Sequence, residues 1–217
     1  MARAPLTRES ALRAAVLLAD ESGLEALSMR RLATALGVEA MSLYHHVANK
    51  GEILDGMVDL VIGEITAPTQ GAGWRTGLED VARSTRAALA RHPWATALLD
   101  SRSTPGPARL AHLDAMIGSL RRAGFTVAAT GHALALFDSY VRGFALQEQA
   151  LPVPADGGIA DVAADVMAQQ ESMATSFPHL TEMATELVLR PGYAFGDEFE
   201  VGLGVVLDGV AGFATRD

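Results

Sequence analysis

Between Ser28 and Leu54 the chain reads SMRRLATALGVEAMSLYHHVANKGEIL, and this stretch decides the fold. Its first part predicts a short helix that Ser28 caps and Gly37 stops, with an apolar face made by Leu32, Ala33 and Leu36. A second short helix is expected over residues 39–47. Two short helices joined by a tight turn around a glycine, which tolerates positive φ, are typical of a helix-turn-helix unit.

The second of these helices carries large side chains on the side that faces away from the protein. If Leu43 marks the buried direction, an advance of about 100° per residue places Met41 at about 160° and His45 at about 200°. Ser42 and Tyr44 flank them. In a DNA-binding unit this helix enters the major groove, so the outward face suits contacts to bases and phosphates. Glycine-turned helix pairs also occur as plain packing units, and that alternative stays open here.

Helical periodicity covers the remaining chain, and no strand alternation interrupts it. Thr7 caps a first helix, and Asn49 with Glu52 forms a capping box for a fourth helix that runs to about Ile65. Further helices are expected over 74–94, 109–123, 126–150, 159–189 (interrupted at 177–178) and 197–215. We therefore predict an all-α fold: an N-terminal three-helix head with a helix-turn-helix, joined by a fourth helix to a helical ligand-binding and dimerisation body. The expected domains are residues 1–52 and 53–217.

Composition narrows the function classes. The 217 residues are 49% hydrophobic and 20% charged, which suits a packed core, and without cysteine there can be no disulfide, thiolate zinc site or cysteine nucleophile. The net charge of −9 is uneven: residues 1–50 carry +1 and the remainder −10, so a DNA-binding head on an acidic body remains possible. The N-terminus lacks the apolar run of a secretory signal and no apolar stretch is long enough to span a bilayer, so we expect a cytoplasmic protein.

Residues 6–57 resemble the DNA-binding head of the tetracycline-repressor (TetR) family. The resemblance rests on ALSMRRLATALGV followed by SLYHHVANK, which is similar to the family signature L-Y-x-H-[VF]-x-[ND]-K. More weakly, residues 74–93 and 121–150 resemble helices in the body of the tetracycline repressor. The resemblance implies an all-α homodimer that represses transcription from a palindromic operator and is released by a small-molecule effector.

Carried over position by position, the resemblance also implies which residues contact DNA. Arg30 matches a base-contacting arginine, and the base-reading positions of the recognition helix hold Ala40, Met41, Ser42 and His45. The phosphate-contacting positions hold Ser28, Tyr44, His46 and Lys50. Lys50, the only lysine, lies at a helix N-terminus, where its charge adds to free backbone N–H groups. Ser28 and Asn49 would cap their helices with or without DNA, and Tyr44 could instead pack its ring on the preceding helix.

Departures from the tetracycline repressor point to another operator and another effector. Ala40 replaces a base-reading glutamine and cannot make the bidentate contact to adenine. Leu99 stands where a magnesium-binding histidine would align, and Met116 replaces a glutamine, so we expect neither a metal site nor a cofactor, and a metal-chelated tetracycline is an unsuitable effector. The expected effector pocket is lined by Val81, Thr85, Leu99, Met116, Leu120, Phe137 and Met167. Dimerisation is expected through Thr126–Ala150 and Asp197–Thr215, where four glycines would allow close helix approach.

Two other function classes remain open. An all-helical enzyme would need a nucleophile–base pair or a metal-ligand set, and the histidines at 92, 112, 132 and 179 have no such spacing and suit structural or exposed positions. We therefore expect no catalytic residues. A helix-turn-helix subunit that binds another protein is the second alternative. No membrane partner is expected.

Overall fold

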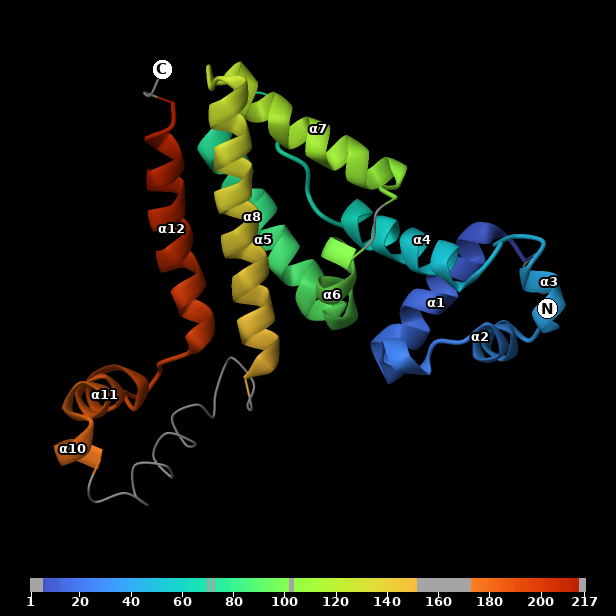
Figure 1. The fold of residues 1–217 in the computed structure, drawn as a ribbon, viewed down its shortest axis with the longest axis horizontal. Helices are drawn as coiled ribbons and strands as arrows, with labels where there is room; N and C mark the ends of the chain where they lie inside the picture. Colours follow the sequence, from blue (N-terminus) through green and yellow to red (C-terminus); the bar gives the residue numbers. More distant parts are fainter. Residues whose placement is uncertain (1–5, 70, 72, 102–103, 152–172, 215–217) are drawn as a thin grey trace.

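The computed structural model describes residues 6–69, 71, 73–101, 104–151 and 173–214, and over these residues the chain is helical with no strand (Figure 1). The prediction of an all-α fold is confirmed. The elements are α1 (Arg8–Ser22), η1 (Leu24–Ala26), α2 (Met29–Leu36), α3 (Ala40–Leu43), α4 (Lys50–Gly63), α5 (Trp74–Arg91), α6 (Pro93–Ser101), α7 (Pro107–Arg122), α8 (Val127–Ala150), α10 (Met173–Ser176), α11 (Pro178–Met183), η2 (Ala184–Val188), η3 (Phe195–Asp197) and α12 (Glu198–Ala211).

The head is built from α1, α2 and α3, which lie to one side of the molecule, and α4 leads from them to the body (Figure 1). Thr7 caps α1 by accepting a hydrogen bond from the Ser10 amide. The turn after α2 passes through Gly37 at φ +60°, in the left-handed region that the sequence predicted for this glycine. α1 and α4 cross closely at Gly56, where a Cβ would lie 2.6 Å from a methyl carbon of Leu12. A larger residue there would require the Leu12 side chain to shift.

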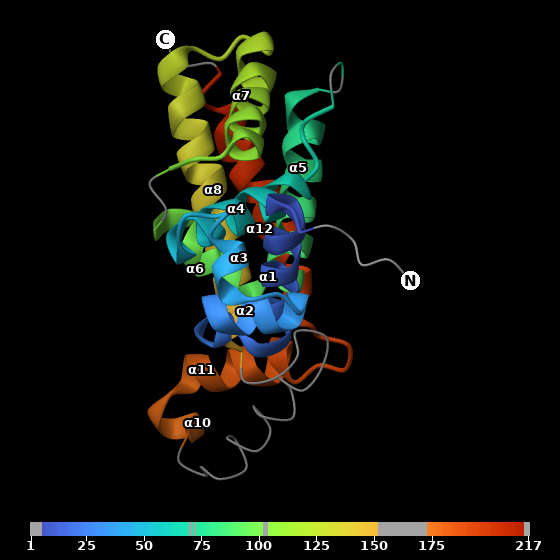
Figure 2. The same cartoon turned by 90° about the vertical axis from the view of Figure 1, so that its right-hand side faces the viewer.

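The body consists of α5 to α8 and α12, and α8 and α12 run side by side in both ribbon views (Figures 1 and 2). One buried cluster joins the head to the start of the body and includes Leu32, Leu43, Ile53, Met57 and Trp94. A second fills the space between α5, α7, α8 and α12; its fully buried side chains include Leu78, Leu120, Phe125, Phe137, Phe199, Leu203 and Leu207. α4 is therefore shared: its apolar face packs on the head, and its final turns reach the body.

The close approach of α8 and α12 depends on Gly202. A Cβ at this position would lie 2.3 Å from the Tyr140 hydroxyl, which donates a hydrogen bond of 2.8 Å to the Phe199 carbonyl. Close helix approach, the role expected for the glycines of this helix, is found at Gly202 within one chain. Gly204 faces open space and Gly209 meets a neighbour only at 3.8 Å, so neither of these two is needed for packing within the chain.

Three element predictions need correction. Residues 39–47 are not one continuous helix, because α3 ends at Leu43 and turns follow. The helix expected over 74–94 ends at Arg91, since Pro93 cannot continue it and instead begins α6, which had not been predicted. In the range expected at 159–189, α10, α11 and η2 account for 173–188, with the interruption at Phe177; residues 159–172 lie outside the described residues.

Among the described residues, no helix has both the length and the apolarity that crossing a membrane requires.

Candidate functional site

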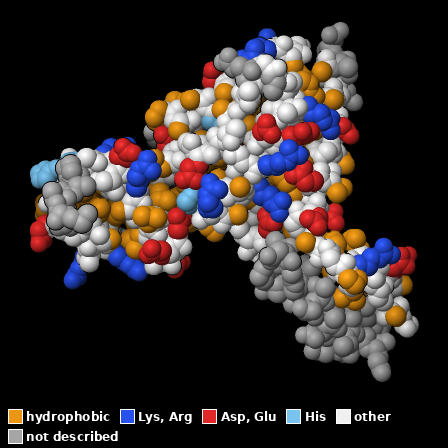
Figure 3. Space-filling model, turned by 180° about the vertical axis from the view of Figure 1, so that it is seen from behind, with side chains coloured by type: hydrophobic (Ala, Val, Ile, Leu, Met, Phe, Trp, Pro, Cys, Tyr) orange, Lys and Arg blue, Asp and Glu red, His pale blue; other side chains and the backbone are white. Residues whose placement is uncertain are grey.

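The outward face of α3 is the first part of the candidate site. Leu43 is fully buried, whereas Met41 is 72% exposed and Tyr44 is 45% exposed, and His45 is exposed as well. Ala40, Ser42 and His46 are half-buried at the edges of this face. The predicted direction of Met41 and His45, away from the interior, is confirmed. In the space-filling view, histidine and basic side chains lie on the outer side of the head, at the left (Figure 3).

α3 is short because the chain must turn back to begin α4. The amides of His46 and Val47 both donate to the Leu43 carbonyl, at 2.9 and 3.0 Å, and Val47 is buried. Asn49 then adopts an extended backbone and caps α4 by accepting from the Glu52 amide at 3.0 Å. The Glu52 carboxylate accepts from the Ala48 amide at 2.7 Å, one residue before the expected capping-box partner. Two buried anchors and a cap therefore hold the outward side chains in place.

The N-termini of α2 and α4 lie next to each other, and Lys50 joins them. Its ammonium group donates a hydrogen bond of 2.6 Å to the Leu27 carbonyl, directly before the Ser28 cap of α2. The Ser28 hydroxyl accepts from the Arg31 amide at 3.2 Å, so its capping role is confirmed. The Arg30 side chain is exposed one turn away. Two positive helix ends and an ammonium group on one surface make a favourable site for phosphate groups.

A cavity of about 190 Å³ in the body is the second part of the candidate site. The end of α4 and helices α5 to α8 supply its lining: Ile62, Ile65, Val81, Thr85, Leu99, Arg109, His112, Leu113, Met116, Phe137, Asp138, Val141 and Arg142. Five of the seven residues expected in an effector pocket are brought together here: Val81, Thr85, Leu99, Met116 and Phe137. Leu120 is a correction, because it does not line this cavity and packs instead within the second buried cluster. Met167 lies outside the described residues.

The polar side of this cavity was not predicted. Asp138 and Arg142, one turn apart on α8, form an ion pair of 3.0 Å. His112 on α7 has a buried Nδ1 atom that has no hydrogen-bond partner in the part of the chain that the structure describes. Burial lowers the pKa of His112, and the nearby Asp138 carboxylate opposes this only in part, so the ring is neutral at pH 7. A sequence reading could have found these residues only by placing α7 and α8 face to face.

The cavity is tied directly to α4. Ile62 and Ile65 contribute to its wall, and Asp59, one turn earlier, accepts hydrogen bonds from the amides of Ala108 and Arg109 at 3.3 and 2.9 Å. These amides belong to the first turn of α7, so a carboxylate of α4 caps a helix of the body. Gly106 makes this approach possible, since a Cβ there would lie 2.2 Å from the Asp59 carboxyl carbon. The first turn of α7 is therefore hydrogen-bonded directly to α4 beside the cavity.

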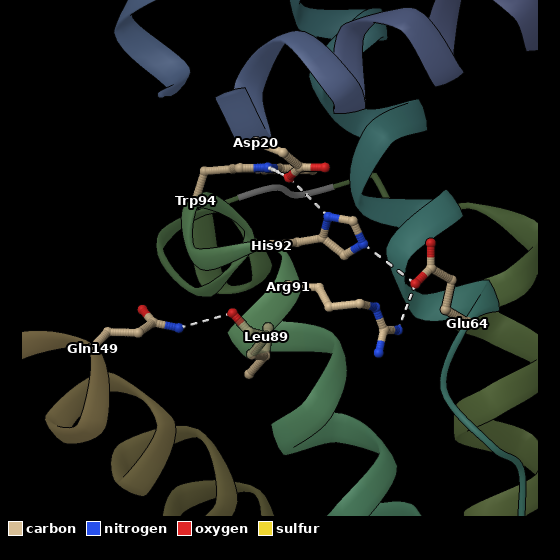
Figure 4. A network of polar contacts seen from close by, with 7 residues as sticks. All are labelled: Asp20, Glu64, Leu89, Arg91, His92, Trp94 and Gln149. Atoms are coloured by element: carbon tan, nitrogen blue, oxygen red, sulfur yellow. Dashed lines mark hydrogen bonds and ion pairs between the residues drawn. The ribbon is translucent and has the colours of Figure 1, made fainter. Parts of the chain in front are cut away.

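A second link between head and body centres on His92, which stands between α5 and α6 (Figure 4). Its Nδ1 lies 2.8 Å from Asp20 of α1, and its Nε2 lies 3.3 Å from Glu64 at the end of α4. Trp94 donates to the same Asp20 oxygen at 2.6 Å, and Arg91 pairs with Glu64 at 2.7 Å. Burial raises the pKa of Glu64, but the hydrogen bonds from Arg91 and His92 outweigh it and hold the pKa below its ordinary value. The buried His92 ring thus joins α1 and the end of α4 to the body.

Within the described ranges, no group of three or more histidine and carboxylate side chains is arranged to hold a metal ion.

Two family models match this chain, and together they cover most of it. "Tetracyclin repressor-like, C-terminal domain" matches residues 67–213, and "Bacterial regulatory proteins, tetR family" matches residues 11–57. The HTH-type transcriptional repressor DrrR1 of Streptomyces coeruleorubidus is 42% identical over 142 residues, which are 64% of this chain and 53% of that protein. The tetracycline repressor protein class C of Escherichia coli is 29% identical over 208 residues, which cover 94% of this chain and 90% of the relative.

A solved structure of the same family superposes on nearly the whole chain. The Streptomyces coelicolor TetR family protein ActR, in complex with actinorhodin, superposes with a TM-score of 0.82 at 29% identity and covers 98% of this chain and 99% of its own. The match to the first curated relatives is partial: the chain spans between about half and three fifths of their length, at 53% and 59%.

Proposed function

This chain belongs to the tetracycline-repressor (TetR) family, and we propose that it is a ligand-responsive transcriptional repressor that binds a palindromic operator as a homodimer. A small-molecule effector in the body would release it from DNA. The observation that carries the proposal is the outward face of α3, where Met41 and His45 point away from a fully buried Leu43. A large apolar side chain exposed beside a histidine on a rigidly held turn suits the major groove.

In this proposal the two parts of the recognition surface divide the work. Ala40, Met41, Ser42 and His45 read bases together with Arg30, and Ser28, Tyr44, His46 and Lys50 contact phosphates. The Lys50 bond to the Leu27 carbonyl supports this division, because it aligns two helix N-termini on the side that would face the backbone of DNA. A phosphate oxygen would compete with the Leu27 carbonyl for the same ammonium group.

The body would convert occupation of the cavity into a change of head position. The Asp59 cap of α7 and the His92 contacts to Asp20 and Glu64 support this, since both join α1 or α4 to helices of the body. A ligand that displaces α7 would move α4, and with it the head, as a rigid unit. ActR, whose structure holds actinorhodin, provides a precedent for a ligand bound to a protein of this fold.

Dimerisation would use α8 and α12, within the ranges Thr126–Ala150 and Asp197–Thr215. Apolar side chains that one chain leaves exposed on these two helices support this assignment: Val127, Leu136, Leu146, Val201 and Val205. Side chains of this kind are stabilised when a second copy covers them.

Selection of duplexes from a random library by the purified chain tests the proposal. We expect enrichment of an inverted repeat whose half-sites lie about one helical turn apart. Failure to enrich any duplex, with the chain folded, would contradict DNA binding. His45→Gln should change the selected bases more than it weakens binding to unrelated duplexes, and an equal loss on both would remove His45 from the base-reading set.

Lys50 offers a sharper test of the phosphate contacts. Lys50→Gln keeps a polar side chain but removes the charge, so the slope of log K against log salt should flatten by about one unit per protomer. Lys50→Arg retains the charge and should preserve the slope. An unchanged slope in Lys50→Gln would show that Lys50 contacts no phosphate.

A further inference from the structure

The cavity in the body is mainly apolar, and its chemistry restricts what can bind. Val81, Leu99 and Phe137 line one part of it and are almost completely buried. At about 190 Å³ it is smaller than the roughly 300–1,000 Å³ of pockets that hold drug-sized ligands. A charged ligand group would be desolvated against these walls. The charges of Asp138 and Arg142 are already paired with each other at 3.0 Å, and Arg109, the third charged residue of the lining, also has an interaction partner within the chain. A small, uncharged and largely apolar molecule is therefore favoured.

His112 supplies a polar contact in this lining. Its Nδ1 atom is buried, and within the described residues no protein group pairs with it. A buried polar atom without a partner costs free energy, which a ligand can recover by forming the missing hydrogen bond. Because burial keeps the ring neutral, one ring nitrogen carries a proton and donates a hydrogen bond, and the other accepts a hydrogen bond. A hydroxyl group pairs with Nδ1 in either tautomer, since it both donates and accepts, whereas a hydrocarbon pairs with neither.

We infer that the effector of this chain is a small, uncharged, largely apolar molecule bearing a hydroxyl group, and that His112 is the residue that recognises the hydroxyl. This inference rests on the proposed function, because it takes the cavity to be the effector site. In the cavity lining, Leu99 and Met116 stand where the resemblance places polar residues of the tetracycline repressor. His112 is thus an added residue that determines specificity. The apolar walls position the ligand in the cavity, and one hydrogen bond to His112 selects a ligand with a hydroxyl group.

The test is a cycle of two compounds and two proteins, measured by isothermal titration calorimetry at pH 7.5 without DNA. The compounds are indan-5-ol and indane, which share the same rings and differ by the hydroxyl group. The native chain should bind indan-5-ol more tightly than indane. In His112→Leu the preference should shift toward indane by about tenfold, as expected for the loss of one hydrogen bond to a buried group.

Two further variants separate recognition from packing. His112→Gln retains a hydrogen-bonding side chain and should keep the preference for the hydroxyl compound. Met116→Leu alters another cavity residue without changing its polarity, and the ratio of the two affinities should stay as in the native chain. The variants are compared only after circular dichroism shows native helicity. If His112→Leu does not fold, His112→Phe carries the test, because it keeps a ring but has no hydrogen-bonding atom.

An affinity ratio in His112→Leu within twofold of the native value would overturn the inference, as would the absence of binding of both compounds to the native chain. Operator binding by the ligand-free chain is a separate measurement. A chain that binds its operator but shows no hydroxyl preference would refute this inference alone, and a chain with the preference but no operator binding would refute the proposed function alone.

Discussion

Replacement of His92 by phenylalanine probes the joint between head and body that Figure 4 shows. The ring is 7% exposed and makes two contacts with carboxylates, 2.8 Å to Asp20 and 3.3 Å to Glu64. Phenylalanine keeps most of the ring volume, so the loss is mainly of hydrogen bonds. Neither carboxylate is left without a partner, because Trp94 still donates to Asp20 at 2.6 Å and Arg91 to Glu64 at 2.7 Å.

The expected loss in free energy of unfolding follows from these contacts. A hydrogen bond to a charged group contributes about 1.5–3 kcal/mol, and the 3.3 Å contact to the half-exposed Glu64 belongs at or below the lower limit. We therefore expect His92→Phe to lower the free energy of unfolding by about 2–3 kcal/mol. Arg91→Ala is the matched control: it removes an exposed partner of the same Glu64, and exposed pairs contribute at most about 1 kcal/mol.

Urea denaturation at pH 7.5, followed by tryptophan fluorescence and circular dichroism, measures both changes at one fixed protein concentration, since the stability of a dimer depends on concentration. The midpoint should fall for His92→Phe with little change in slope. A loss below about 0.5 kcal/mol, or a loss no larger than that of Arg91→Ala, would refute the assignment of His92 as the buried link.

Three further predictions concern separate contacts. Asp59→Ala removes the cap that α4 provides for α7 and should cost about 1 kcal/mol in urea denaturation; an unchanged midpoint would show that the two amides at 3.3 and 2.9 Å are equally well satisfied by water. Gly202→Ala places a Cβ 2.3 Å from the Tyr140 hydroxyl and should cost about 1–3 kcal/mol, and the added change Tyr140→Phe should recover part of that loss; no recovery would place the clash elsewhere. Hydrogen bonds from the Ala48 amide and then from Arg8 hold the pKa of Glu52 below its ordinary value, so its ionised form stabilises the fold above the unfolded pKa and that stabilisation is lost as pH falls through the folded pKa. The difference in midpoint between the native chain and Glu52→Gln should therefore be largest near neutral pH and shrink below about pH 4, and a difference that is constant with pH would contradict it.

The local signals of the head were sufficient for its fold. Ser28 and Asn49 as caps, Gly37 as the turn and Leu43 as the buried anchor all act over a few residues, and hydrogen bonds and φ angles over that range depend on the sequence itself. The outward direction of Met41 and His45 followed from helical periodicity. The true length of α3 did not follow from periodicity, because the end of α3 depends on the turn that brings Lys50 to Leu27.

The body required the tertiary structure. Five of the residues expected in an effector pocket line the cavity, whereas Leu120 has the same apolar character and does not, since periodicity tells which face is buried but not what covers it. His112 and His92 belong to no motif, and the sequence favours structural or exposed positions for them. In the structure, His112 supplies an unpaired nitrogen to the cavity, and His92 joins Asp20 and Glu64, which lie 72 and 28 positions away in the chain. The sequence by itself thus determined most of the helices, the caps at Ser28 and Asn49 and the outward face of α3. Only the packing of distant helices decided where the cavity lies and how it is joined to α4, because such contacts arise from geometry that no local pattern records.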